Sequence, residues 1–123
     1  ISALEISEYY KKAGVYLQPS FYETFGLCIL EGMASGNAIV ATNVGGIPEV
    51  VKENGILTKP NTKDLTKAII RLLSNDSLRL KYKRKSLERA KEFDWVIIGD
   101  KTLKVYQDLI KKKKTNESSQ IVI

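Results

Sequence analysis

The sequence has 123 residues, of which 43% are hydrophobic and 28% charged, and its formal net charge is +6. This length is sufficient for one domain with a modest core and too short for two full domains. No apolar run approaches the roughly 20 residues that cross a bilayer. The single cysteine, Cys28, excludes an internal disulfide and favours a reducing, cytoplasmic setting.

The positive charge is concentrated in two segments. One is the lysine run 111–114, and the other extends from Arg79 to Lys91, where Glu88 is the single acidic residue. A lysine-rich helical face is usually solvated, and peripheral contact with anionic lipid headgroups is the main alternative. Nucleic acid is not an expected partner, because basic and aromatic residues do not interleave on a predicted strand.

The first part of the chain alternates between predicted helices and strands. Apolar residues at helical spacing predict a helix over 3–13, and the apolar run 15–18 predicts a strand. A second helix is expected over 25–35, with Gly36 at its end. The following run, 38–42, is apolar on both faces and is therefore typical of a fully buried strand.

The second part of the chain adds one strand and then becomes helical. A short helix is expected over 48–52 and a strand over 55–58. Three further helices are predicted: 63–74, 77–92 and 95–112. Asp76 and Asp94 are the expected N-caps of the last two of these helices.

The order of these elements indicates the fold class. Strands alternating with helices through short links are typical of a parallel sheet with right-handed crossovers. The predicted fold is therefore α/β, a Rossmann-like parallel sheet with flanking helices. It occupies residues 1–114, and residues 115–123 are expected to form a disordered tail.

Two glutamates stand eight residues apart, on either side of a glycine that opens a predicted helix. Glu23 precedes Gly26, and Glu31 lies about two turns after the opening. Ligands bind at the carboxyl ends of parallel strands, and the unpaired amides of a helix start suit a phosphate or a sugar hydroxyl. Glu23 would accept hydrogen bonds from neutral hydroxyls, and Glu31 could reach a ribose diol. Taken singly, each glutamate is more often an exposed surface residue.

A second turn suited to an anion follows the strand predicted over 38–42. Gly45 and Gly46 stand directly before a helix start, and adjacent glycines let a ligand approach the backbone closely. A plain tight connection is the alternative interpretation. The chain carries neither a G-x-G-x-x-G fingerprint nor a Walker lysine motif.

The absence of histidine excludes several other chemistries. A Ser-His-Asp triad, a Cys-His pair and a histidine-ligated metal all require a residue that this sequence lacks. Cys28 is interpreted as a buried small hydrophobe rather than as a reactive thiol. Tyr9, Tyr10, Phe93 and Trp95 are interpreted as packing residues rather than as a stacking platform for a base.

Several separate segments together resemble the C-terminal, donor-binding domain of the retaining GT-B glycosyltransferases of the large E-x7-E (group 1) family. The segments that carry the resemblance are, in chain order, Tyr9-Tyr10-x-x-Ala13-Gly14-Val15, the pair Glu23 and Glu31, the run from Ala38 to Glu49, Asn54-Gly55-Ile56-Leu57, and Phe93-Asp94-Trp95. The likeness extends from residue 8 to residue 110. It implies an incomplete C-terminal half of a GT-B fold.

The resemblance implies an activity and a role for each site residue. A hexose would be transferred from a nucleotide-diphosphate sugar to a glycan, lipid or small-molecule acceptor, with retention of configuration. Glu23 would be the catalytic residue that contacts hydroxyls of the transferred sugar, and Glu31 would bind the ribose. The residues that would border the sugar and diphosphate are Phe25, Gly26, Leu27, Cys28, Gly45 and Gly46. Neither a metal nor a cofactor besides the donor substrate is implied.

The resemblance also implies parts that are not found in these 123 residues. Family members have an N-terminal domain that binds the acceptor, and their C-terminal domain begins with strands that carry an arginine and lysine clamp for the diphosphate. We therefore expect a part of a longer enzyme, inactive alone, with that N-terminal domain as partner. An exposed strand Val15–Gln18 would favour self-association. A non-catalytic nucleotide-sugar-binding or interaction module with the same fold is the alternative.

Overall fold

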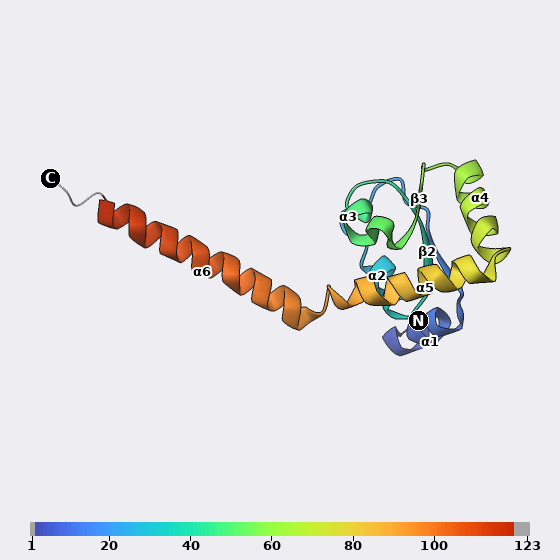
Figure 1. Ribbon diagram of the computed structural model, residues 1–123, viewed down its shortest axis with the longest axis horizontal. Coiled ribbons are helices and arrows are strands. Elements are labelled where there is room, and N and C mark those ends of the chain that lie inside the picture. Colours follow the sequence, from blue (N-terminus) through green and yellow to red (C-terminus); the bar gives the residue numbers. More distant parts are fainter. Residues whose placement is uncertain (1, 120–123) are drawn as a thin grey trace. The chain divides into compact units, whose positions relative to one another are not determined.

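A three-stranded parallel sheet is the centre of the computed structural model, which describes residues 2–119 (Figure 1). Strands β1 (Val15–Gln18), β2 (Ala38–Thr42) and β3 (Gly55–Thr58) lie in the order β1-β2-β3. All five residues of β2 are buried, because this strand has a neighbour on each side and helices over both faces. The predicted α/β fold with a parallel sheet is confirmed.

One face of the sheet is covered by α4 (Thr62–Leu73) and by part of α5 (Asp76–Lys91). Figure 1 shows α4 beside the strands, opposite α3. Side chains alternate between the two faces of a strand, so every second residue of β2 points toward α4. The buried core on this face consists of Ala38, Val40, Ala68 and Leu72.

The other face of the sheet is covered by α2 (Leu27–Ala34) and α3 (Ile47–Val51), and α3 continues into a short 3₁₀ turn, Lys52–Asn54. The contact between α2 and β1 is close. A Cβ atom on Gly32 would lie 2.9 Å from the Cγ atom of Tyr16. A glycine in the helix therefore lets the aromatic ring of the strand lie directly against the helix backbone.

Local signals set the ends of the first two helices. Helix α1 (Ala3–Lys12) begins with a capping box, in which the hydroxyl oxygen of Ser2 accepts from the amide of Glu5 and the Glu5 carboxylate accepts from the amide of Ser2. These hydrogen bonds lower the pKa of Glu5. At the end of α2, Ser35 is followed by Gly36, whose φ of 73° is the left-handed conformation expected of a glycine there.

The N-cap of α5 differs from the predicted residue. Asn75 has extended backbone angles, and its side-chain oxygen accepts the amide of Leu78 at 2.8 Å, so Asn75 caps the helix and Asp76 is its first residue. Asparagine and aspartate both suit an N-cap, and the extended backbone angles occur at Asn75. The prediction for Asp94 is confirmed, because its Oδ1 atom accepts the amide of Val96 at 2.8 Å.

Helix α6 (Trp95–Ser119) belongs to a second unit, Phe93–Ile123, which is separate from the unit Ile1–Glu92 that contains the sheet. The helix includes residues 115–119, for which the sequence predicts a disordered tail. Its last turns contain neither glycine nor proline, the residues that most strongly oppose a helix. The remaining residues, 120–123, lie outside the described part of the chain. None of the helices within residues 2–119 is both long and apolar enough to cross a bilayer.

Candidate donor-binding site

The loops that follow β1 and β2 meet at the carboxyl edge of the sheet. The amide of Gly46 donates to the carbonyl of Glu23 at 2.9 Å. At the end of β2, the buried hydroxyl of Thr42 donates to the carbonyl of Ser20 at 2.6 Å. These two hydrogen bonds hold the first loop against the second, so Glu23 and the two glycines lie at one point.

The close approach of the two loops requires both glycines. Gly45 has a φ of 51°, in the left-handed region, and a Cβ atom on it would lie 1.9 Å from the carbonyl oxygen of Glu23. A Cβ atom on Gly46 would lie 2.1 Å from the carbonyl oxygen of Thr24. Neither separation is sterically allowed. The pair Gly45-Gly46 is therefore a packing requirement of this site and more than a flexible connection.

Gly26 gives α2 an open N-terminus. Its φ of 92° is again left-handed, and as N-cap it provides no side chain to occupy the first amides of the helix. Within the part of the chain that the structure describes, the amides of Leu27 and Cys28 donate to no protein acceptor. Two N–H groups at the positive end of the helix are thus available to an anion.

Glu23 lies beside this helix start. The side chain is half-buried, and its Oε1 atom accepts the amide of Thr24 at 3.1 Å. A Cβ atom on Gly26 would lie 3.6 Å from the Cγ atom of Glu23, so the glutamate is close to the opening of α2. A carboxylate here repels a phosphate and accepts hydrogen bonds from uncharged hydroxyls. The site therefore offers a hydroxyl acceptor next to anion-binding amides.

Glu31 lies on the second turn of α2 and contacts α1 rather than Glu23. Its Oε2 atom accepts the hydroxyl of Tyr10 at 3.1 Å. Burial and this hydrogen bond raise the pKa of Tyr10, and burial also raises the pKa of the neighbouring Tyr16 to about 12. The helical spacing of Tyr10 predicts a packing residue, and it gives no sign that the hydroxyl reaches a residue on another helix.

The prediction that Cys28 is buried is wrong. Its side chain is exposed, because Ile29 and Met33 are the residues of α2 that face the sheet. The side chains of Phe25 and Leu27 are also exposed. The start of α2 therefore presents apolar side chains to solvent beside its open amides. Tyr9 is exposed as well, whereas Tyr10 is buried, so the packing interpretation holds for one of these two tyrosines.

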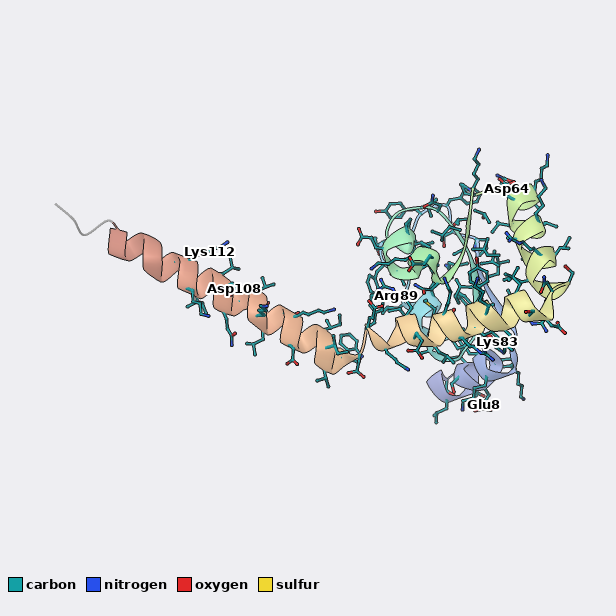
Figure 2. The ribbon with its side chains drawn as sticks, viewed as in Figure 1. Glu8, Asp64, Lys83, Arg89, Asp108 and Lys112 are labelled. Atoms are coloured by element: carbon teal, nitrogen blue, oxygen red, sulfur yellow. The ribbon has the colours of Figure 1, made fainter. Side chains whose placement is uncertain are left out.

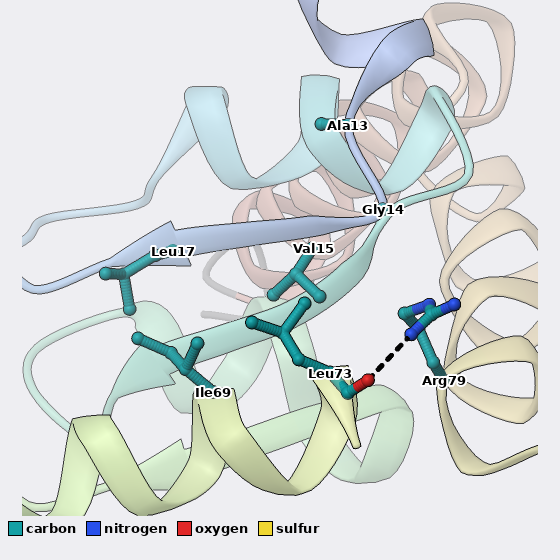
Figure 3. A pocket seen from close by; sticks show the side chains of 7 residues that line it. All are labelled: Ala13, Gly14, Val15, Leu17, Ile69, Leu73 and Arg79. Atoms are coloured by element: carbon teal, nitrogen blue, oxygen red, sulfur yellow. Dashed lines mark hydrogen bonds between the residues drawn. The ribbon is translucent and has the colours of Figure 1, made fainter. Parts of the chain in front are cut away.

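An apolar groove of about 570 Å³ lies elsewhere, along the edge of β1 (Figure 3). Figure 3 shows Val15 and Leu17 of β1 facing Ile69 of α4, with Arg79 near one end of the groove. The guanidinium of Arg79 donates to the carbonyl of Leu73 at 3.3 Å. None of the predicted donor-binding residues lines this groove. It offers no cluster of polar groups that would orient a nucleotide.

Comparison with known proteins shows which family the chain resembles. The sequence model of the family described as "Glycosyl transferases group 1" matches residues 1–89, which include both loops of the site. O-antigen chain mannosyltransferase B of Escherichia coli is 39% identical over 99 residues, covering 80% of this chain and 26% of that protein. Alpha-maltose-1-phosphate synthase of Mycolicibacterium smegmatis is 35% identical over 113 residues, covering 84% of this chain and 29% of that protein.

A solved structure is similar in both fold and sequence. Sucrose-phosphate synthase from Thermosynechococcus elongatus superposes with a TM-score of 0.80 at 31% identity, covering 91% of this chain and 29% of that one. The chain thus spans less than a third of the length of these three relatives. On the strength of the family match and of these similarities, the chain belongs to the glycosyl transferases group 1 family.

Proposed function

We propose that this chain is the donor-binding part of a retaining glycosyltransferase that transfers a hexose from a nucleotide-diphosphate sugar. The observation that carries the proposal is the backbone contact between Gly46 and Glu23, which joins a carboxylate, a glycine turn and the open start of α2. Membership of the family supports transferase chemistry. One relative is named as a mannosyltransferase, which supports a hexose as the transferred group.

Each site residue has a defined role in this proposal. Glu23 accepts hydrogen bonds from hydroxyls of the transferred sugar, and Glu31 binds the ribose. The groups around the diphosphate are the amides of Phe25, Gly26, Leu27 and Cys28 together with the Gly45-Gly46 turn. Amides at a helix start stabilise the negative charge that develops on a departing diphosphate, and no metal is required for that.

The proposed reaction exchanges one bond at the anomeric carbon for another. The bond between that carbon and the diphosphate oxygen breaks, and the acceptor oxygen bonds to the same face of the sugar. The leaving phosphate takes the proton of the acceptor hydroxyl. An N-terminal domain of the longer protein would hold the acceptor, so we expect this chain alone to bind the donor without turning it over.

Protein-observed NMR titration tests the proposal. We expect UDP-glucose or GDP-mannose to shift the amides of Gly26 to Cys28 and of Gly45 and Gly46, because these groups contact the diphosphate. Glu23→Ala will weaken binding of the sugar nucleotide toward that of UDP or GDP, since its carboxylate contacts the sugar alone. The matched control is Glu8→Ala, which removes an exposed glutamate of α1 paired with Lys11.

Two results would contradict the proposal. Either no amide shifts at millimolar ligand, or the shifts cluster along the β1 groove instead of at the strand ends. In the longer protein, Glu23→Ala will abolish sugar transfer. Donor binding in a longer protein that transfers no sugar would favour the non-catalytic binding module.

We also propose that two copies of this chain associate through the edge of β1. Within residues 2–119, β1 pairs with β2 alone, and Leu17 leaves 38% of its surface exposed beside the apolar groove. An unpaired edge of a parallel sheet attracts another strand. Sedimentation velocity at high micromolar concentration will show dimers, and Leu17→Lys will shift the chain to monomer. Ile70→Lys, an exposed apolar position outside the groove, is the control. A wild-type monomer at that concentration contradicts the proposal.

A further inference from the structure

We propose that Tyr10 is a positioning residue for Glu31: its hydroxyl holds one carboxylate oxygen so that the other is presented to the ribose of the bound nucleotide. This inference rests on the proposed function, because it takes Glu31 as the ribose-binding residue. It adds to that function a second residue, on another helix, which would determine how well the site distinguishes ribose from sugars without vicinal hydroxyls.

The hydrogen bond between the two side chains gives the two carboxylate oxygens of Glu31 different surroundings. The Tyr10 hydroxyl donates to Oε2 of Glu31 at 3.1 Å, and it lies 3.5 Å from the carbonyl oxygen of Cys28. Among the described residues, Oε1 of Glu31 accepts no hydrogen bond, and Glu31 is exposed. One oxygen is therefore held by the protein while the other is free to accept from a ligand hydroxyl.

The tyrosine is itself held firmly against α2. Tyr10 is 9% exposed, and its ring centroid lies 5.6 Å from that of Tyr16, which packs against Gly32 of α2. Asn37 is fully buried, and its side-chain amide donates to the carbonyl of Tyr10 at 2.9 Å and to that of Gly32 at 3.2 Å. The backbone and the ring of Tyr10 are thus both tied to the helix that carries Glu31.

The hydroxyl acts as a permanent donor at neutral pH. Burial and the hydrogen bond to Glu31 raise the pKa of Tyr10, so the phenol stays protonated at neutral pH in the folded protein. An exposed glutamate on a helix otherwise samples several rotamers and loses that freedom on binding a ligand. Holding one oxygen in advance removes part of this entropic cost, as preorganised groups do in binding sites.

The test compares Tyr10→Phe with Tyr9→Phe in this 123-residue chain. Tyr10→Phe keeps the buried ring and removes the donor to Glu31. Tyr9→Phe removes the hydroxyl of an exposed tyrosine on the same helix, which makes it a matched control. Three-bond NMR couplings report the rotamers of Glu31 without any ligand. Titrations with UDP and GDP, and with their 2′,3′-dideoxy analogues, report how strongly the ribose hydroxyls are recognised.

We expect Tyr10→Phe to average the Glu31 couplings and to weaken binding of the ribose nucleotide about two- to tenfold, the cost of ordering one flexible side chain on binding. Binding of the dideoxy analogue will not change, and Tyr9→Phe will alter neither measurement. In a Glu31→Ala background, Tyr10→Phe will have no further effect on nucleotide affinity, because the tyrosine acts through that carboxylate. If Tyr10 had a purely structural role, Tyr10→Phe would weaken the binding of ribose and dideoxyribose nucleotides equally.

The outcomes distinguish a failure of the inference about Tyr10 from a failure of the proposed role of Glu31. If the Glu31 couplings are the same in Tyr10→Phe and in the wild type, Tyr10 does not position Glu31, and the inference is overturned whatever binds. If the wild-type chain binds ribose and dideoxyribose nucleotides equally, Glu31 does not bind the ribose, and its proposed role is overturned together with the inference. Averaged couplings together with a loss confined to the ribose nucleotide support both.

Discussion

Replacing Gly45 by alanine will push the two loops of the proposed donor-binding site apart and abolish the proposed binding of the nucleotide sugar. The new Cβ atom would lie 1.9 Å from the carbonyl oxygen of Glu23, and the φ of 51° is a left-handed conformation. That conformation alone costs an L-residue about 1–2 kcal/mol. Relief of the clash requires the loop to move away and break the hydrogen bond from Gly46 to Glu23 at 2.9 Å.

The expected loss of stability is about 2–4 kcal/mol, which combines the conformational cost with the broken loop contact. Urea unfolding will measure this loss, and the NMR titration with UDP-glucose and GDP-mannose will measure binding. Gly14→Ala is the matched control, since its Cβ atom would meet no heavy atom nearer than 3.7 Å and lies away from the site. Unchanged binding in a folded Gly45→Ala variant would show that the contact between the loops is not needed for the site.

Replacing Arg89 by methionine will destabilise the domain by about 3–5 kcal/mol, because two backbone carbonyls lose hydrogen bonds to a charged donor, each of which contributes about 1.5–3 kcal/mol. Figure 2 labels Arg89 on α5. The side chain is buried, and its guanidinium donates to the carbonyls of Glu49 at 2.6 Å and Val50 at 2.9 Å and pairs with Glu92. Those two carbonyls belong to α3, the helix that follows the Gly45-Gly46 turn.

The geometry of the guanidinium is essential to this contact. A planar fork can donate to two neighbouring carbonyls at once, whereas the ammonium of lysine is a single point of charge on a flexible stem. Arg89→Lys is therefore expected to recover only part of the stability. Urea unfolding provides the measurement, with Arg84→Met, an exposed arginine of the same helix, as the control. A loss below about 1 kcal/mol, the size expected for an exposed pair, would refute a supporting role under the site.

Some features of the site were predictable from short stretches of sequence. The order of strands and helices follows from apolar periodicity, and Gly26, Gly45 and Gly46 stand where the backbone needs a glycine. Other features were missed. Asn75 rather than Asp76 caps α5, since both residue types suit the position and the backbone decides. Cys28 is exposed because packing turned a different side of α2 toward the sheet.

Three features follow directly from the order of residues: the α/β alternation, the placement of two glutamates around a helix start, and the glycine turn after the second strand. Those signals are local, since propensity and periodicity act within a few residues. Three contacts follow from tertiary packing instead: the glycine turn lies on the backbone of Glu23, Tyr10 donates to Glu31 across 21 residues, and Arg89 donates to Glu49 of α3 across 40 residues. Such contacts depend on how the helices pack on the sheet, and the spacing of residues in the sequence does not predict them.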